Sequence, residues 1–157
     1  MKLIGIIDTD TVNYKKISMV LEFPYCSFKC DRECGKKVCQ NSDLASAPII
    51  DIKIDEIIKM YNNNPMTEAI VCQGLEPMDS IYDLFNFIEN FRKESQDDIV
   101  IYTGYKKEEI FHIVKQLMNY PNIVIKFGRF IPDEQYHYDD VLGVNLASMN
   151  QYAERIS

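Results

Sequence analysis

Four of the five cysteines lie close together in the chain, at Cys26, Cys30, Cys34 and Cys39. A reducing cytosol does not favour disulfides, and thiolates are soft ligands that suit zinc and iron–sulfur clusters. The crowding therefore indicates a metal or cluster site, and we interpret it as an iron–sulfur site. A loop of free thiols and a zinc knuckle of all four cysteines are the alternatives. Zinc sites usually open with two or four residues between the first ligands, whereas the gaps here are three, three and four residues.

The spacing Cys26-x3-Cys30 resembles the opening of the radical S-adenosylmethionine (SAM) motif, CxxxCxxC. In that superfamily three thiolates hold three irons of a 4Fe-4S cluster. The fourth iron is left open for the amino and carboxylate groups of SAM. The third ligand departs from the motif, because Cys34 comes one residue too late and Cys39 follows a longer insertion.

We favour Cys39 over Cys34 as the third ligand. Apolar Val38 precedes Cys39, as an aromatic or small residue precedes the third cysteine in many members, whereas charged Glu33 precedes Cys34. The sequence Cys39-Gln40-Asn41 also resembles the Cys-x-Asn of the small activating enzymes in this superfamily. Cys34 is then an extra thiol at the rim of the loop. If all four thiolates bind instead, the protein is a ferredoxin-like electron carrier or a zinc protein.

A second motif, Gln73-Gly74-Leu75-Glu76-Pro77, follows a predicted strand, at the end of which an open α/β sheet places its ligands. It resembles the Gly-Gly-Glu-Pro motif of radical SAM enzymes, with Leu75 in place of the second glycine. In the family this segment lines the methionine end of SAM. Gly74 permits close backbone approach, Pro77 fixes the turn, and Glu76 offers a carboxylate to a cationic ligand.

Three later segments resemble the activating enzymes of anaerobic ribonucleotide reductase, in the same order. Tyr-Thr-Gly-Tyr at 102–105 ends a predicted strand, and Thr103 would hydrogen-bond SAM there; a plain strand-to-helix turn is an equal alternative. Residues 126–131 resemble an Asp-Gly-Arg-Phe segment, and residues 146–151 are similar to Gly-Ser-x-Asn-Gln. The predicted SAM-binding residues are therefore Asn41 of the Cys-x-Asn sequence, the turn Gly74–Pro77, and Thr103.

Hydrophobic patterns predict elements that would position these motifs. Continuous apolar runs predict the strands, and apolar residues at helical spacing predict the helices. Strands are expected at 1–7, 17–23, 68–73, 99–102 and 123–127, and helices at 51–61, 80–91 and 107–118. This alternation predicts an α/β fold with a mainly parallel sheet. The resemblance implies a partial β/α barrel with the cluster at the carboxyl ends of its strands. Cys72, within a predicted strand, is expected to be a buried structural thiol.

Length and composition predict a single domain over residues 1–157, with the cluster loop at 24–41. The net charge is −7, and no run of lysine or arginine exceeds two residues, which argues against nucleic-acid binding through phosphates. The apolar N-terminus is too short for a signal peptide. No stretch approaches the roughly 20 apolar residues that span a bilayer. We therefore expect a soluble, cytoplasmic protein without membrane contact.

The resemblance as a whole implies a radical SAM activase like that of anaerobic (class III) ribonucleotide reductase. Reduced flavodoxin or ferredoxin would supply one electron to a 4Fe-4S cluster held by Cys26, Cys30 and Cys39. SAM would then be cleaved to methionine and a 5′-deoxyadenosyl radical, which removes hydrogen from a glycine Cα of a partner glycyl radical enzyme. Two alternatives stay open. One is a radical SAM enzyme that acts on another peptide or small molecule, and the other is a non-enzymatic four-cysteine cluster or zinc protein.

Overall fold

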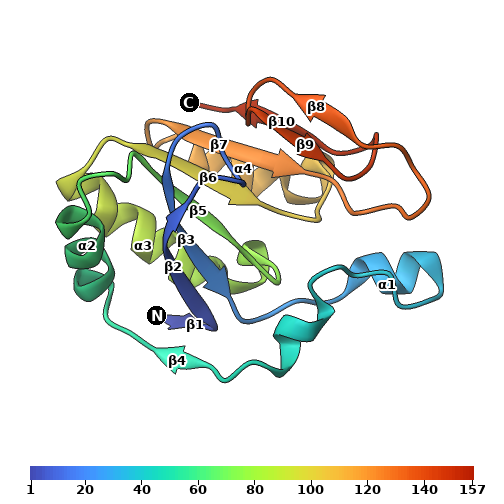
Figure 1. Ribbon diagram of the computed structural model, residues 1–157, viewed down its shortest axis with the longest axis horizontal. Coiled ribbons are helices and arrows are strands. Elements are labelled where there is room, and N and C mark those ends of the chain that lie inside the picture. The colour runs from blue at the N-terminus through green and yellow to red at the C-terminus, as the bar shows by residue number, and fades with distance from the viewer.

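A mixed sheet of six strands, in the order β10-β7-β6-β5-β3-β2, forms the centre of the computed structural model, which describes residues 1–157 (Figure 1). Its four inner strands are parallel, and both edge strands are antiparallel to their neighbours. The inner strands are β3 (Ser18–Phe23), β5 (Ala69–Gly74), β6 (Asp98–Tyr102) and β7 (Ile123–Phe127), and the edges are β2 (Gly5–Asp10) and β10 (Tyr152–Arg155).

Two hydrophobic clusters hold the sheet from its two faces. Alternate residues of each inner strand point to opposite faces, so that Met19, Ile70 and Ile99 join the larger cluster and Val20, Val71 and Val100 the smaller one. Burial on both faces explains why these strands read as continuous apolar runs. The strand prediction at 123–127 is confirmed, and those at 17–23, 68–73 and 99–102 are confirmed to within one residue at either end.

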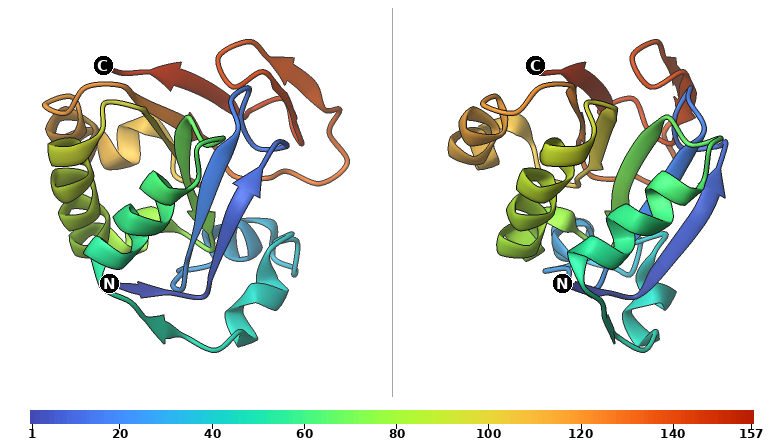
Figure 2. Two further views of the ribbon diagram at one scale, coloured as in Figure 1. Left: turned by 60° about the vertical axis from the view of Figure 1, so that its left-hand side comes forward. Right: turned by 90° about the vertical axis from the view of Figure 1, so that its left-hand side faces the viewer.

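Three helices cover the face with the larger cluster, and they lie together on one side of the sheet in Figure 2. They are α2 (Ile54–Asn63), α3 (Ile81–Glu94) and α4 (Phe111–Leu117). Short 3-10 helices, η2 (Pro77–Ser80) and η3 (Lys107–Ile110), lead into α3 and α4. Helix α4 buries a narrower strip than its sequence predicts, because Phe111 and Met118 are both more than half exposed. Ile110, Val114 and Leu117 form the buried strip, and Phe111 and Met118 each lie one residue further on, at the exposed edge of that strip.

The smaller face is covered by the chain after β2 and by the C-terminal part of the protein. Tyr14, Leu142 and Leu146 pack there against the inner strands. The hairpin of β8 (His137–Asp139) and β9 (Val144–Leu146) contributes the last of these residues. Neither this hairpin nor β10 is predicted by sequence pattern.

The N-terminal prediction of one strand at 1–7 is only partly right. The chain forms β1 (Lys2–Leu3), which pairs with β4 (Ile50–Asp51), and then β2. The sheet is open, because β2 and β10 are both edges and do not pair with each other. The partial barrel therefore stays a prediction. No helix has the length and apolar character needed to cross a membrane.

Candidate functional site

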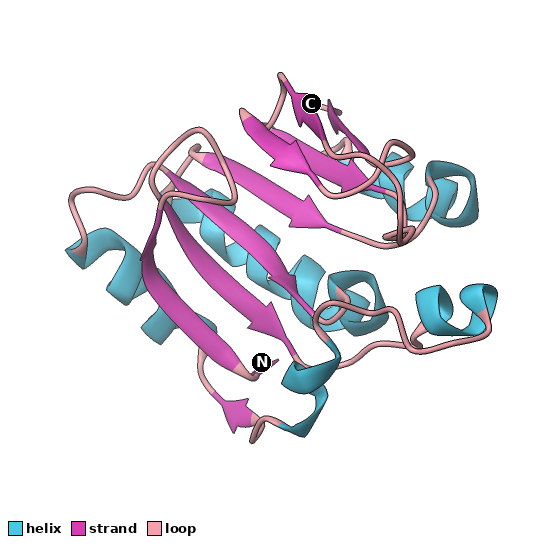
Figure 3. Ribbon diagram, turned by 45° about the vertical axis from the view of Figure 1, so that its right-hand side comes forward, coloured by secondary structure: helices cyan, strands magenta, loops and turns pink.

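A cavity of about 350 Å³ lies where the parallel strands end. Its walls come from the turns after β3, β5, β6 and β7 and from the C-terminal segment. In Figure 3 the arrowheads of the parallel strands point toward the side of the molecule on which the cysteine loop lies. Cys26, Cys30 and Cys39 line this cavity, whereas Cys34 does not and is exposed.

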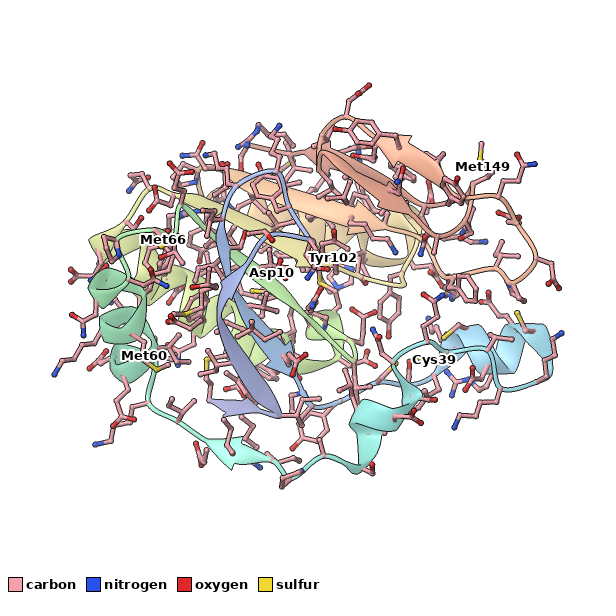
Figure 4. All side chains as sticks on the ribbon, viewed as in Figure 1. Asp10, Cys39, Met60, Met66, Tyr102 and Met149 are labelled. Atoms are coloured by element: carbon pink, nitrogen blue, oxygen red, sulfur yellow. The ribbon has the colours of Figure 1, made fainter.

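The cysteine loop leaves the sheet at Phe23 and is held to the turn after β5 by backbone hydrogen bonds. The Leu75 N–H donates to the Phe23 carbonyl at 3.1 Å, and the Glu76 N–H donates to the Tyr25 carbonyl at 2.9 Å. These bonds fix Cys26 beside the second predicted motif. The loop then forms α1 (Lys29–Cys34), with Cys30 in its first turn and Cys34 at its end, and the short η1 (Ser42–Ser46). Cys39 lies on the segment between these two helices, next to α1 (Figure 4).

The Cys26 and Cys30 thiols are in an environment that favours their protonated form when no metal is bound. Burial raises the pKa of Cys26 to about 12. The pKa of Cys30 is also raised, first by burial and then by the neighbouring Cys39 thiol. Ligation by these sulfurs must therefore release protons.

The donor set fits an iron–sulfur cluster. No three His, Cys, Asp or Glu side chains are grouped so that they could hold a metal ion. In a 4Fe-4S cluster each cysteine binds its own iron, so the thiols surround the cluster and do not converge on one point. Three thiols that line one cavity meet this requirement, and each is at least partly exposed to it.

The turn after β5 forms the wall next to the cysteine loop. Gly74 ends β5 with a φ of 99°, and a Cβ there would lie 2.7 Å from the Phe23 nitrogen, so only glycine fits. Its carbonyl accepts a hydrogen bond from the Asn41 side chain at 3.0 Å. Leu75 and Glu76 line the cavity with these two residues, and Pro77 begins η2 outside the lining. The predicted SAM-binding residues of these two motifs thus share one wall, with the exception of Pro77.

Glu76 is buried, and both of its carboxylate oxygens are hydrogen-bonded within the chain. One accepts the Met78 N–H at 3.0 Å, and the other accepts the Gly104 N–H at 2.8 Å. Burial raises its pKa to about 7. The next wall is the turn at Thr103 and Gly104, where the Thr103 hydroxyl accepts the Tyr105 N–H at 3.0 Å. Thr103 lines the cavity and also stabilises the strand-to-helix turn, and its hydrogen bond to SAM stays a prediction.

Three basic residues of the cavity wall, Lys29, Lys126 and Arg129, were not among the predicted site residues. Lys126 is buried, has no carboxylate partner, and donates only to the Gly128 carbonyl, at 2.8 Å. Burial lowers its pKa to about 8. Arg129 binds Glu109 at 2.6 Å and Glu33 of α1 at 3.4 Å. The resemblance of residues 126–131 to the Asp-Gly-Arg-Phe segment is the sequence feature from which this part of the cavity wall could have been predicted.

The C-terminal segment closes the remaining side. Gln151 accepts the Ala147 N–H at 3.0 Å and donates to the Gly128 carbonyl at 3.3 Å. Leu146, Ala147 and Gln151 line the cavity together with Gly128. Every segment singled out in the sequence, from the cysteines to residues 146–151, therefore contributes to one cavity.

Three thiols that face one cavity at the carboxyl ends of the strands are the donor set of an iron–sulfur protein. The chain belongs to the 4Fe-4S single cluster domain family, which its sequence matches over residues 16–151. This match covers the four inner strands of the sheet, the cysteine loop and the C-terminal wall of the cavity, and it leaves out the edge strands β2 and β10. A search of curated proteins and a search of solved structures returned no match. Cys72 is fully buried in β5, which confirms its prediction as a structural thiol.

Proposed function

We propose that this 4Fe-4S protein is a radical SAM enzyme, and that its substrate is a glycine Cα of a partner glycyl radical enzyme, as in anaerobic ribonucleotide reductases. The observation that carries the proposal is one of position. Cys26, Cys30 and Cys39 line the same cavity as Gly74 and Glu76 of the turn that resembles the SAM-binding motif. A simple electron carrier or a structural zinc site does not need the second group of residues.

The three cysteines would hold the cluster, and Cys34 would stay outside the ligand set. When bound, the cluster supplies the electron that cleaves SAM into methionine and a 5′-deoxyadenosyl radical. The residues of the chain itself would bind and orient SAM. The methionine end of SAM would lie against a wall formed by Asn41 and by the backbone at Gly74 and Leu75. Thr103 would contact SAM from the turn after β6.

The charges of the cavity wall suit a zwitterionic ligand that carries a sulfonium. Buried Lys126 has no carboxylate partner, so an anionic ligand group would offset the cost of its burial. We assign the SAM carboxylate to Lys126. The Glu76 carboxylate lines the same cavity, at the turn after β5, and we assign the amino group of SAM to it. The proposed reductant is flavodoxin or ferredoxin, and the partial barrel belongs to the same proposal.

The test is anaerobic reconstitution with iron and sulfide, followed by dithionite reduction and electron paramagnetic resonance with and without SAM. We expect a reduced-cluster signal that changes shape when SAM is added. Cys34→Ser should keep this response, and Cys39→Ser should lose it. A cluster that ignores SAM, or that requires Cys34, would overturn the proposal in favour of a four-cysteine site.

The partner is tested separately. A mixture of the reconstituted protein, SAM, reductant and a glycyl radical enzyme should give an organic radical signal on the partner. Substitution of the attacked glycine by alanine in the partner should abolish that signal. SAM cleavage without any radical on such partners would favour the alternative, a radical SAM enzyme that acts on another peptide or small molecule.

A further inference from the structure

The long gap between Cys30 and Cys39 is bridged by one side chain. Asp31 follows Cys30 in the chain, and a single oxygen of its carboxylate accepts two backbone hydrogen bonds. The donors are the N–H groups of Val38 and Cys39, each 2.8 Å away. The residue next to one predicted ligand thus binds the backbone of another.

No hydrophobic contact can replace this link. Helix α1 has no buried residue, and it ends at Gly35, whose left-handed φ of 67° reverses the chain. The returning segment lies on the surface as far as Val38. Two further interactions hold this segment. One is the exposed ion pair between Lys37 and Asp43, at 3.9 Å, and the other, beyond Cys39, is the hydrogen bond from the Asn41 side chain to the Gly74 carbonyl. A loop of this kind has many conformations, most of which separate the two thiols.

We propose that Asp31 is the positioning residue that brings Cys39 to Cys30, and that it thereby allows a spacer of eight residues to replace the two-residue spacer of the radical SAM motif. The inference rests on the proposed ligand set. Its result is visible in the cavity, because Cys39 reaches the lining beside Cys30, and Cys34, although nearer in sequence, is left at the exposed end of α1.

Asp31 holds Cys39 in place by accepting hydrogen bonds, and not through its charge alone. Asp31→Asn keeps an oxygen at the position that receives both N–H groups, and Asp31→Ala removes it. Asp43→Ala is the matched control, because it removes an equal charge from a fully exposed side chain in the same loop. Val38→Pro removes one of the two donors without changing Asp31, since proline has no N–H.

The first measurement uses the metal-free chain. Mild oxidation and peptide mass spectrometry give the ratio of the Cys30–Cys39 disulfide to the Cys30–Cys34 disulfide. In Asp31→Ala this ratio should fall about tenfold, the size expected when two backbone hydrogen bonds lose their acceptor. Asp31→Asn and Asp43→Ala should stay within about twofold of the wild type, and Val38→Pro should fall between the two groups.

The second measurement uses the reconstituted protein. Iron per chain should drop in Asp31→Ala and recover in Asp31→Asn, and the SAM-induced change of the cluster signal should follow the same order. Circular dichroism establishes that the sheet is folded in each variant. An unchanged disulfide ratio and iron content in Asp31→Ala would overturn the inference. Equal losses in Asp31→Ala and Asp31→Asn would assign the effect to charge and would also overturn it. Because the disulfide ratio needs neither cluster nor SAM, it stays informative if the proposed function fails.

Discussion

The Glu76 carboxylate accepts a hydrogen bond from the Gly104 N–H, 2.8 Å away, and so joins the turn after β5 to the turn after β6. The other carboxylate oxygen receives the Met78 N–H at the start of η2. Glu76 is therefore a structural brace of the cavity as well as a residue of the predicted SAM-binding set. Its burial raises its pKa to about 7, and this gives a consequence that can be measured without any cofactor.

We expect the free energy of unfolding of the metal-free chain to contain a Glu76 contribution that decreases from pH 5 to pH 8. The folded state holds the proton more tightly than the unfolded state, so the stabilisation present below the unfolded pKa is lost as the pH rises through about 7. The loss is at most about 3 kcal/mol. Urea unfolding at both pH values, on the wild type and on Glu76→Gln, measures it. The same pH dependence in both proteins would contradict the prediction.

Gly74→Ala should destabilise the chain strongly. A Cβ at this position meets the backbone of β3 at 2.7 Å from the Phe23 nitrogen, and the φ of 99° disfavours any side chain. We expect a loss of about 3 kcal/mol or more in the free energy of unfolding. Gly35→Ala is the control, because it has a positive φ but open space around it, and it should lose about 1 kcal/mol. Similar losses in both variants would show that the contact with β3 is unimportant.

Lys126→Met should weaken SAM binding without unfolding the protein. The substitution removes a buried cation that has no carboxylate partner, and methionine fills a similar volume. We expect the dissociation constant for SAM to rise about tenfold or more, since a charge-assisted hydrogen bond is lost. Anaerobic equilibrium dialysis of the reconstituted protein gives this constant. Exposed Lys115 on α4 supplies the control, Lys115→Met, and affinities that match in the two variants would refute the assignment of Lys126.

Glu109→Gln should loosen the cysteine loop. Glu109 binds Arg129 at 2.6 Å and Lys29 of α1 at 3.3 Å, and its pKa is lowered to about 2, first by Arg129. The variant should lose about 1–2 kcal/mol of stability at pH 7, less than a fully buried pair would lose, because Glu109 is partly exposed. Hydrogen exchange should rise in α1 more than in the sheet. Neighbouring Glu108 takes no part in these ion pairs, so an equal effect of Glu108→Gln would count against the prediction.

The elements that the sequence predicts well are those that hydrophobic burial decides. The run at 123–127 is buried on both faces of the sheet, and its apolar residues reveal it directly. Helix α1 could not be found in this way, because it buries no side chain and is attached by ion pairs to Glu109 and Arg129, far along the chain. The apolar spacing also counted Phe111 in the buried strip of its helix, but that strip is formed by Ile110, Val114 and Leu117, and Phe111 lies at its exposed edge.

The candidate site was likewise predictable only in part from the sequence. The segments that line the cavity are recognisable in the sequence as short motifs that follow the predicted strands. The preference for Cys39 over Cys34 came from adjacent residues, and the ligand assignment stays a prediction. The part played by Lys126 was not predictable, because a lysine that reads as ordinary surface charge becomes significant only through its burial and its lack of a carboxylate partner.

The absence of buried side chains in α1 has a consequence for how the protein folds. Both hydrophobic clusters, and with them the whole sheet, are complete without any residue of this helix. The body of the protein does not depend on α1 for its core, so its sheet should be able to fold whether or not a cluster is bound in the cysteine loop.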